Sequence, residues 1–355
     1  MHDRHLPFEH LDRMTDSTGL IQHAVYSVPR RDSGYTTDDN ARALRLCASA
    51  WRWQQDGRMA SRLATYLSFL EYARAPGGAF HNFLSYQRHW LDEEGGGDCQ
   101  GQVARALAEV LASNVADDFR ALARELIEGI RPTLAGFQWP RAWAYAVLAW
   151  GRLWTAGLED AEPLENVAWT GARRLVECYH GSARHHWEWF EPCMTYANAV
   201  MPHALFVAAQ RWPKEEFLEV AERSFAFLDG VTTTNDFYWP VGNHGWYPRE
   251  GEKAHYDQQP VEAGTLAEAA LAAFGSLRDP KYLAAFRRAR DWFHGHNSLG
   301  LPLADFRRGA CFDGLKESGV NRNQGAESTL AYLTTALENV AAQSVQSNDL
   351  ETANA

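Results

Sequence analysis

The sequence predicts an all-α protein whose helices form an (α/α)6 barrel, a closed ring of six helical hairpins. The main evidence is one pattern that occurs six times: a short polar stretch with Gly, Pro or Asn leads directly into an Ala- and Leu-rich amphipathic helix. The stretches lie about 40 to 65 residues apart, the length that one helical hairpin and its loops require. They begin at Thr36, Asp98, Trp139, Thr195, Gln259 and Asn323.

A second set of helices, richer in charge, is expected between these starts. Amphipathic spacing places them at residues 58–74, 117–131, 163–179, 214–228 and 280–293. Small residues in one set and charged residues in the other indicate an inner ring that is surrounded by an outer ring exposed to water.

The domain organisation follows from the length of the chain and from the lack of a linker within it. The 355 residues exceed the usual domain size, but no Pro- or Ser-rich linker and no run of like charge divides them. We therefore expect one barrel domain over residues 1–342. Residues 343–355 are polar and are expected to form a disordered tail.

The composition excludes some classes of partner. A net charge of −11 argues against nucleic acid and against anionic membranes, since both are bound through clustered Lys and Arg. The N-terminal ten residues lack the apolar core of a signal peptide, and no segment approaches the length of a membrane span. The five cysteines lie far apart without C-x-x-C spacing, which favours a reducing compartment. We expect a cytoplasmic protein.

Aromatic residues indicate the kind of ligand. They make up 12% of the chain, and many lie in the loops before the inner helices. At such a mouth an indole or phenol ring can cover the apolar face of a sugar, while amides and carboxylates bind its hydroxyls. The alternative is that these rings only cover a large core. The aromatic candidates for sugar contact are Tyr26, Tyr35, Trp187, Trp189, Trp246 and Tyr256.

Acidic residues occur at the same junctions. Hydrolysis of a glycosidic bond uses one carboxylic acid to protonate the leaving oxygen and a second carboxylate as base or nucleophile. Asp38 and Asp39 begin the first inner helix and Asp98 begins the second, although each could simply be an N-cap. His23, Arg30 and Tyr35 precede Asp38 in the sequence and are further candidates for substrate contact.

The segment H-H-W-E-W-F-E-P places Glu188 and Glu191 among three aromatic residues, just before the fourth inner helix. A carboxyl that is held against indole rings loses hydration, which raises its pKa toward the value that a general acid needs. Glu191 is therefore the predicted proton donor.

The fifth and sixth junctions add further candidates. Asp257, Gln259 and Glu262 lie close together in the fifth, where Glu262 could face the cavity or take a capping role. Asn321 and Glu327 come from the sixth, where Glu327 also lies at the position of a capping-box partner.

No metal site and no cofactor are expected. The 14 histidines lack the i, i+4 spacing of a helical zinc site. The chain also has no P-loop, no dinucleotide fingerprint and no G-x-S-x-G elbow. A cation held by Asp38 or Asp39 stays open as an alternative.

Four segments carry a resemblance to known families: H-L-D-R-M-T-D-S-T-G-L-I-Q-H-A, G-Y-T-T-D-D-N-A-R-A-L, D-Q-Q-P-V-E-A and N-Q-G-A-E-S-T-L-A-Y-L. The chain resembles the six-hairpin glycosidase superfamily over nearly its whole length. More narrowly, it is similar to a bacterial group of six-hairpin proteins that occur joined to or beside glycosyltransferases. The resemblance implies a carbohydrate context and an association with a glycosyltransferase, but it supplies no catalytic residues.

The Asp38–Asp39 pair also resembles the Asp-Asp pair of α-1,6-mannanases. Its setting, T-T-D-D-N-A-R, departs from the aromatic surroundings of that family, so the resemblance does not assign a mannanase activity.

The function that these observations favour is a glycoside hydrolase acting on an oligosaccharide or polysaccharide. A wide barrel mouth leaves room for a water between two carboxylates, which favours inversion. Glu191 would be the acid and Asp39 or Glu262 the base, with Asp38 and Asp98 binding sugar hydroxyls.

Two alternatives stay open. A sugar isomerase or epimerase on the same fold would transfer protons at a sugar carbon through histidines, for which His23, His203, His244 and His255 are available. A non-catalytic glycan-binding partner of a glycosyltransferase would have aromatic and amide side chains in its cavity but no working pair of carboxylates.

Overall fold

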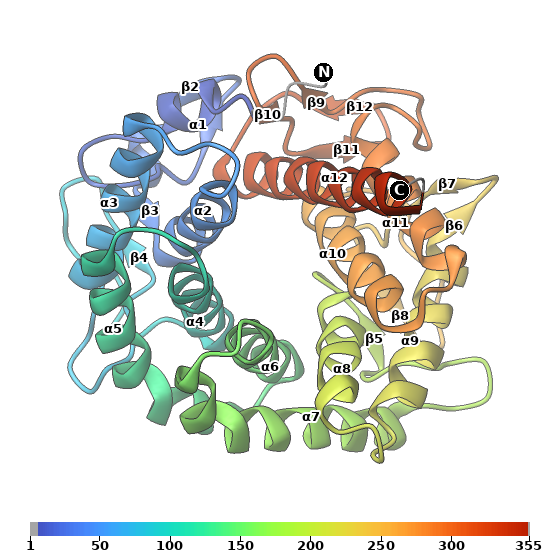
Figure 1. Ribbon diagram of the computed structural model, residues 1–355. Helices are drawn as coiled ribbons and strands as arrows, with labels where there is room; N and C mark the ends of the chain where they lie inside the picture. The colour runs from blue at the N-terminus through green and yellow to red at the C-terminus, as the bar shows by residue number, and fades with distance from the viewer. Residues whose placement is uncertain (1–5, 354–355) are drawn as a thin grey trace.

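The helices form two concentric rings in the computed structural model, which describes residues 6–353 (Figure 1). Each inner helix contacts the next, and the last contacts the first, so the inner ring is closed. The inner helices are α2 (Thr37–Ala50), α4 (Gly97–Ala112), α6 (Pro140–Thr155), α8 (Val200–Arg211), α10 (Pro260–Leu277) and α12 (Ala326–Ala353).

The outer ring is made by the charged helices that the sequence predicts. Their bounds are α3 (Gly57–Tyr72), α5 (Asp117–Ala135), α7 (Glu162–Ser182), α9 (Phe217–Thr232) and α11 (Pro280–Phe293). The shorter helices are α1 (Glu9–Met14), η1 (Arg31–Ser33) and η2 (Glu159–Ala161).

Small side chains on the inner helices allow this close packing. An inner helix touches an inner neighbour on each side as well as the outer ring, so most of its surface is buried. Ala263, Ala267 and Ala270 of α10 are fully buried. Gly101 of α4 lies where a Cβ would come within 2.5 Å of the Tyr145 Cβ on α6. The Ala-rich composition of these helices is therefore a packing requirement.

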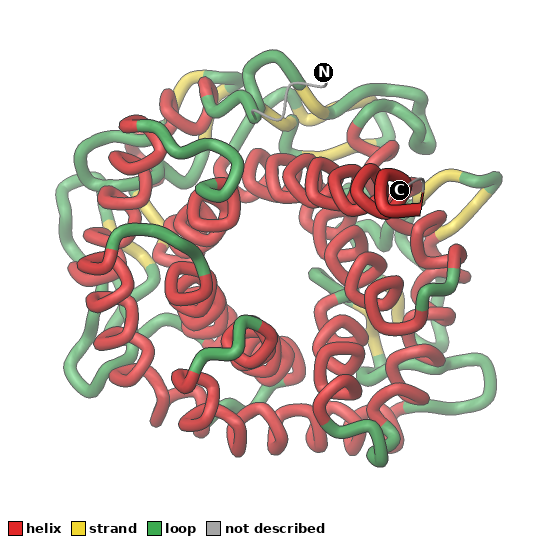
Figure 2. The backbone as a smooth tube through the Cα atoms, in the orientation of Figure 1, coloured by secondary structure: helices red, strands yellow, loops and turns green. Residues whose placement is uncertain are grey.

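Within residues 6–353, six pairs of short antiparallel strands lie in the loops that precede inner helices, and two of these pairs, β3–β4 and β5–β8, join different loops (Figure 2). After each inner helix the chain returns to the same end of the barrel before the next inner helix begins. The loops that precede inner helices therefore lie together at one mouth of the barrel. The pairs are β1 (Ala24–Val25) with β2 (Val28–Pro29), β3 (Tyr35–Thr36) with β4 (Phe83–Leu84), β5 (Cys193–Met194) with β8 (Tyr247–Pro248), β6 (Thr233–Thr234) with β7 (Phe237–Tyr238), β9 (Ala304–Asp305) with β10 (Ala310–Cys311), and β11 (Gly314–Lys316) with β12 (Gly319–Asn321).

The C-terminal part of the chain differs from the sequence prediction. Helix α12 continues to Ala353, whereas a disordered tail is predicted from residue 343. The last two residues of that tail, and residues 1–5 of the predicted domain, lie outside the described residues. Within residues 6–353, no helix is long and apolar enough to cross a membrane.

Candidate active site

Five carboxyl side chains line one cavity at the mouth where the inner helices begin. The cavity has a volume of about 400 Å³. It draws its acidic groups from the starts of α2 and α12 and from the loops before α10 and α12. They are Asp38, Asp39, Asp257, Asp313 and Glu327.

Asp39 is the most buried of these acids. It lies in the first turn of α2, where the Thr36 side chain caps the helix by accepting a hydrogen bond from the Asp39 backbone N–H (3.1 Å). The Thr36 hydroxyl in turn donates to Asp39 Oδ2 (2.6 Å). Burial, and then the neighbouring charge of Asp38, raise the pKa of Asp39 to about 7. Asp39 can therefore hold a proton near neutral pH.

Asp38 and Glu327 share one guanidinium. Arg42, one helical turn after Asp38, donates from Nε to Asp38 Oδ1 (2.5 Å), and its Nη2 lies 3.6 Å from Glu327 Oε2. Arg42 thus places one positive charge against both carboxylates. The Glu327 side chain is 47% exposed, but the surrounding cavity walls limit its hydration and raise its pKa, while the Arg42 charge opposes that rise.

Asp313 is held against the start of α12. Its Oδ1 accepts a hydrogen bond from the Gly325 backbone N–H (2.6 Å). A Cβ at Gly325 would come within 3.0 Å of that oxygen, so glycine permits the approach. Burial raises the pKa of Asp313, although the Gly325 hydrogen bond lowers it.

Several other predicted binding residues also line this cavity. His23, Gln259 and Asn321 do so, together with Asp257 and Glu327. Asp257 also lines an adjoining cavity of about 710 Å³, together with the predicted Tyr256. The two cavities share Lys316 as well. The structure therefore brings these predicted residues together at one mouth of the barrel.

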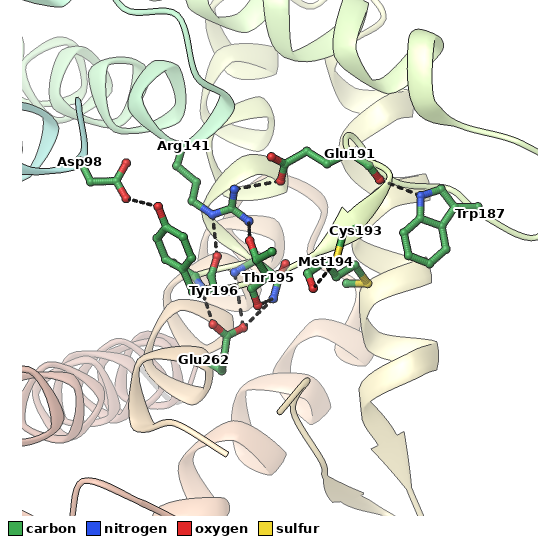
Figure 3. Close-up of polar contacts among 11 residues, drawn as sticks. Asp98, Arg141, Trp187, Glu191, Cys193, Met194, Thr195, Tyr196 and Glu262 are labelled. Atoms are coloured by element: carbon green, nitrogen blue, oxygen red, sulfur yellow. Dashed lines mark hydrogen bonds and ion pairs between the residues drawn. The ribbon is translucent and has the colours of Figure 1, made fainter. Parts of the chain in front are cut away.

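Glu191 lies outside both cavities, and its surroundings differ from the prediction. Its carboxylate pairs with Arg141, with 2.8 Å between Glu191 Oε2 and Arg141 Nη1 (Figure 3). The Trp187 indole N–H donates to the Glu191 backbone oxygen (2.8 Å) and not to the carboxyl. The Glu191 carboxyl is therefore engaged by a guanidinium and is not held against the indole ring of Trp187.

Glu262 is buried, with 3% of its surface exposed, and it supports the start of α8. Its two oxygens accept hydrogen bonds from the backbone N–H groups of Ala197 and Asn198 and from the Asn198 side chain (Figure 3). Burial raises its pKa to about 7. The prediction that Glu262 faces the cavity as a base is wrong, because the turn before α8 engages both of its oxygens.

Replacing Glu262 with Ala tests this structural role. The change leaves the Ala197 and Asn198 N–H groups buried without an acceptor, which should lower the free energy of unfolding by about 2–4 kcal/mol. Chemical denaturation measures that loss. Activity per folded molecule should stay within a few-fold of the unchanged protein, and a loss of activity without a loss of stability would contradict this role.

Three of the predicted aromatic contacts belong to the core. Trp187, Trp189 and Tyr35 are 3%, 0% and 2% exposed. Trp189 packs against Phe190, and the Tyr35 hydroxyl donates to Asp16 (2.8 Å). These rings cannot stack on a sugar, because no face of them reaches solvent.

The remaining predicted residues lie at the surface around the mouth. Tyr26 is exposed, and Arg30 is paired with Asp32 through two hydrogen bonds. Asp98 accepts a hydrogen bond from the Tyr196 hydroxyl (2.7 Å), and burial raises its pKa (Figure 3).

Tyr196 itself was not predicted, and it offers an exposed ring at this mouth. It is 41% exposed, and its ring centroid lies 6.5 Å from that of the predicted, half-buried Trp246. The Arg141 guanidinium lies 4.5 Å from the Tyr196 ring centroid, which holds the ring in place. Tyr196 and Trp246 thus form an aromatic pair that stays partly exposed, while the exposed Phe83 lines the acidic cavity itself.

Sequence reasoning also missed Arg42, Asn82, Asn243 and Lys316 at the cavity. Arg42 carried a usable signal, since it follows Asp38 by four residues and helical spacing brings such a pair together. Asn82, Asn243 and Lys316 come from loops and carried no local signal.

Of the four histidines of the alternative enzyme class, three line the two adjoining cavities at the mouth and one lies elsewhere. His203 lies in a different cavity at the other end of the inner ring, and burial lowers its pKa to about 4. His244 and His255 line the adjoining cavity, and His23 lines the acidic one. Among the described residues, no group of three or more His, Cys, Asp or Glu is arranged to hold a metal ion.

Solved structures share this arrangement of helices over nearly the whole chain. A sugar epimerase from a ruminal bacterium has a TM-score of 0.71 at 11% identity, covering 94% of this chain and 95% of its own. The chain is an (α/α)6 barrel. The fold class predicted from the sequence is therefore confirmed.

Other enzymes that act on carbohydrates have the same fold. A GH76 α-mannanase of Bacteroides thetaiotaomicron has a TM-score of 0.64 at 9% identity, covering 95% of this barrel and 93% of its own chain. The cellulase Cel9M of C. cellulolyticum, in complex with cellobiose, has a TM-score of 0.62 at 11% identity, covering 94% and 90%. No protein-family model and no curated protein sequence matches the chain. At these identities the similarity establishes the fold of the barrel alone.

Proposed function

We propose that this barrel is a glycoside hydrolase whose proton donor is Asp39. The observation that carries the proposal is the pairing of a proton-holding Asp39 with an Asp38 that forms an ion pair with Arg42, inside a cavity lined by five carboxyl groups. Two neighbouring acids in such different surroundings are the usual basis of acid and base roles at one site.

In the proposed reaction, the Asp39 carboxylic acid donates its proton to the glycosidic oxygen as the bond from that oxygen to the anomeric carbon breaks. A water attacks the anomeric carbon and gives its proton to Asp38, so one water is added overall. Glu327 lies across Arg42 from Asp38 and would bind sugar hydroxyls, as would Asp257 and Gln259. Tyr196 and Trp246 would cover a sugar ring.

The acidic cavity favours hydrolysis over epimerisation. Proton transfer at a sugar carbon near neutral pH needs bases such as histidine close to that carbon. Among the described residues, the wall of this cavity contains His23 as its single histidine beside five carboxyl groups, while His244 and His255 line the adjoining cavity.

The pH dependence should report Asp39. Its folded pKa of about 7 lies above its ordinary value of 3.8, so the protonated donor is present below pH 7 and is lost above it. We expect kcat/KM to fall about tenfold per pH unit above about pH 7. Initial rates between pH 5 and 9, with stability followed in parallel, measure this limb. A rate that stays constant to pH 9 would exclude Asp39 as the donor.

The activity itself is tested by reducing-sugar release from a panel of α- and β-linked oligosaccharides. Hydrolysis of at least one linkage is expected. NMR of the first-formed anomer is expected to show inversion, since a water attacks the anomeric carbon directly in the proposed reaction. Binding of oligosaccharides without release of reducing sugar would instead favour the non-catalytic partner of a glycosyltransferase.

A further inference from the structure

A second cavity lies inside the barrel, at the end opposite the acidic one. It has a volume of about 380 Å³, and all six inner helices contribute to its wall. Its residues come from the middle and the C-terminal halves of these helices, whereas the acidic cavity lies at their starts. None of its residues takes part in the proposed hydrolysis.

A buried ionic cluster closes the inner end of this cavity. Arg45 Nη1 and Arg105 Nη2 both donate to the same oxygen of Glu268, Oε1, the second at 3.1 Å. The Arg105 and Glu268 side chains are only 8% and 9% exposed. Two guanidinium charges thus meet one carboxylate, which leaves a buried excess of positive charge.

One of the two arginines of this cluster is incompletely satisfied. Among the described residues, Arg45 Nε has no hydrogen-bond partner. Burial and the adjacent Arg45 lower the pKa of Arg105, although the Glu268 carboxylate opposes that effect. An additional anion beside the pair would relieve this repulsion.

The outer wall of the cavity adds a further positive charge. Arg152 is neutralised by Glu109 through two hydrogen bonds, at 2.7 and 3.1 Å. Arg52 is exposed at the rim with its guanidinium 4.5 Å from the Trp53 ring centroid, and it forms no ion pair with the part of the chain that the structure describes. The remaining acid, Glu338, has its pKa raised to about 7, mainly by burial and then by Glu268.

The wall therefore holds four arginines against three glutamates, one of which is partly protonated near neutral pH. This balance contrasts with the net charge of −11 on the whole chain. The C-terminal ends of helices disfavour anions, so the arginines must supply the attraction. Guanidinium groups bind carboxylate and phosphate oxygens in pairs.

We propose that this cavity binds a small polyanion, a molecule with two or more negative charges on phosphate or carboxylate groups. The anion would lie between Arg52 at the rim and the Arg45–Arg105 pair at the inner end. The cavity is separate from the Asp38–Asp39 site, so this binding does not depend on the hydrolase activity.

Titration calorimetry of the full chain with inorganic phosphate, and separately with citrate, tests the site against sodium chloride of equal ionic strength. We expect saturable binding of one or both polyanions. Arg52→Gln should raise the Kd at least tenfold, and Ser49→Phe should do the same by filling the cavity, which Ser49 lines. Arg58→Gln, on the exposed face of α3, is the matched control and should bind as the unchanged protein does.

Phosphate binding without citrate binding would assign the site to phosphate esters, and the reverse would assign it to polycarboxylates. Equal weakening in Arg52→Gln and Arg58→Gln would show only general screening of charge and would overturn the proposal. The absence of saturable binding to the unchanged protein would overturn it as well. Thermal unfolding of each variant without ligand identifies any variant that misfolds. Because Arg52 is exposed, Arg52→Gln should fold normally.

Discussion

Asp39→Asn is expected to lower kcat by about 10²- to 10⁴-fold, with little change in the affinity for substrate. The substitution keeps the shape of the side chain and its hydrogen bond with Thr36, but an amide cannot deliver a proton to the leaving oxygen. Rates with an oligosaccharide substrate, and separately with an activated aryl glycoside, measure the effect. The aryl glycoside should lose less, since its leaving group needs less protonation.

Two further variants make this result specific. Asp32→Asn, an exposed aspartate paired with Arg30, is the matched control and should keep full activity. Glu191→Gln distinguishes the present account from the prediction made from the sequence, since it alters the Arg141 ion pair outside the cavity. If Glu191→Gln abolishes the reaction and Asp39→Asn does not, the assignment of the donor to Asp39 is wrong.

Arg42→Gln is expected to lower both activity and stability. It removes the charge that faces Asp38 and Glu327, and the loss of one partner from a buried ion pair costs about 3–5 kcal/mol. Because the Arg42 charge also lowers the pKa of Asp39, its loss should raise that pKa and move the fall in rate above pH 7 to higher pH. We expect kcat/KM near neutral pH to fall about a hundredfold.

Arg42→Lys separates charge from geometry in this prediction. Lysine keeps the positive charge but cannot reach two carboxylates through a planar fork. It should recover most of the stability and the pH at which the rate falls, with activity between those of Arg42→Gln and the unchanged protein. Denaturation and rate profiles of both variants check this order. A fall in rate at an unchanged pH in Arg42→Gln would show that Arg42 does not act on the pKa of Asp39.

The fold could be predicted because its signals are local. The pattern that begins at Thr36 leads into α2 from Thr37, and the one at Gln259 leads into α10 from Pro260. Small residues recur along every inner helix because each is packed on several sides. The end of α12 was missed because polar residues at a chain end are compatible with both helix and disorder.

The candidate site could be predicted only in part. Asp38, Asp39 and Glu327 were located because junctions before inner helices share one mouth. The roles of Glu191 and Glu262 depend on partners 50 and 65 residues away, which no local pattern specifies. Aromatic clustering before α8 was equally ambiguous, since the same rings can fill a core or face a ligand.

The most direct test of the central claim is NMR of the unchanged protein with an oligosaccharide panel in D2O. The account predicts cleavage of a glycosidic bond, with new reducing-end signals and no deuterium on sugar carbons. An intact linkage with deuterium incorporated next to the carbonyl carbon of the open-chain sugar would show proton transfer at carbon and contradict the hydrolase. Oligosaccharides that bind but stay unchanged would contradict catalysis by the Asp38–Asp39 pair altogether.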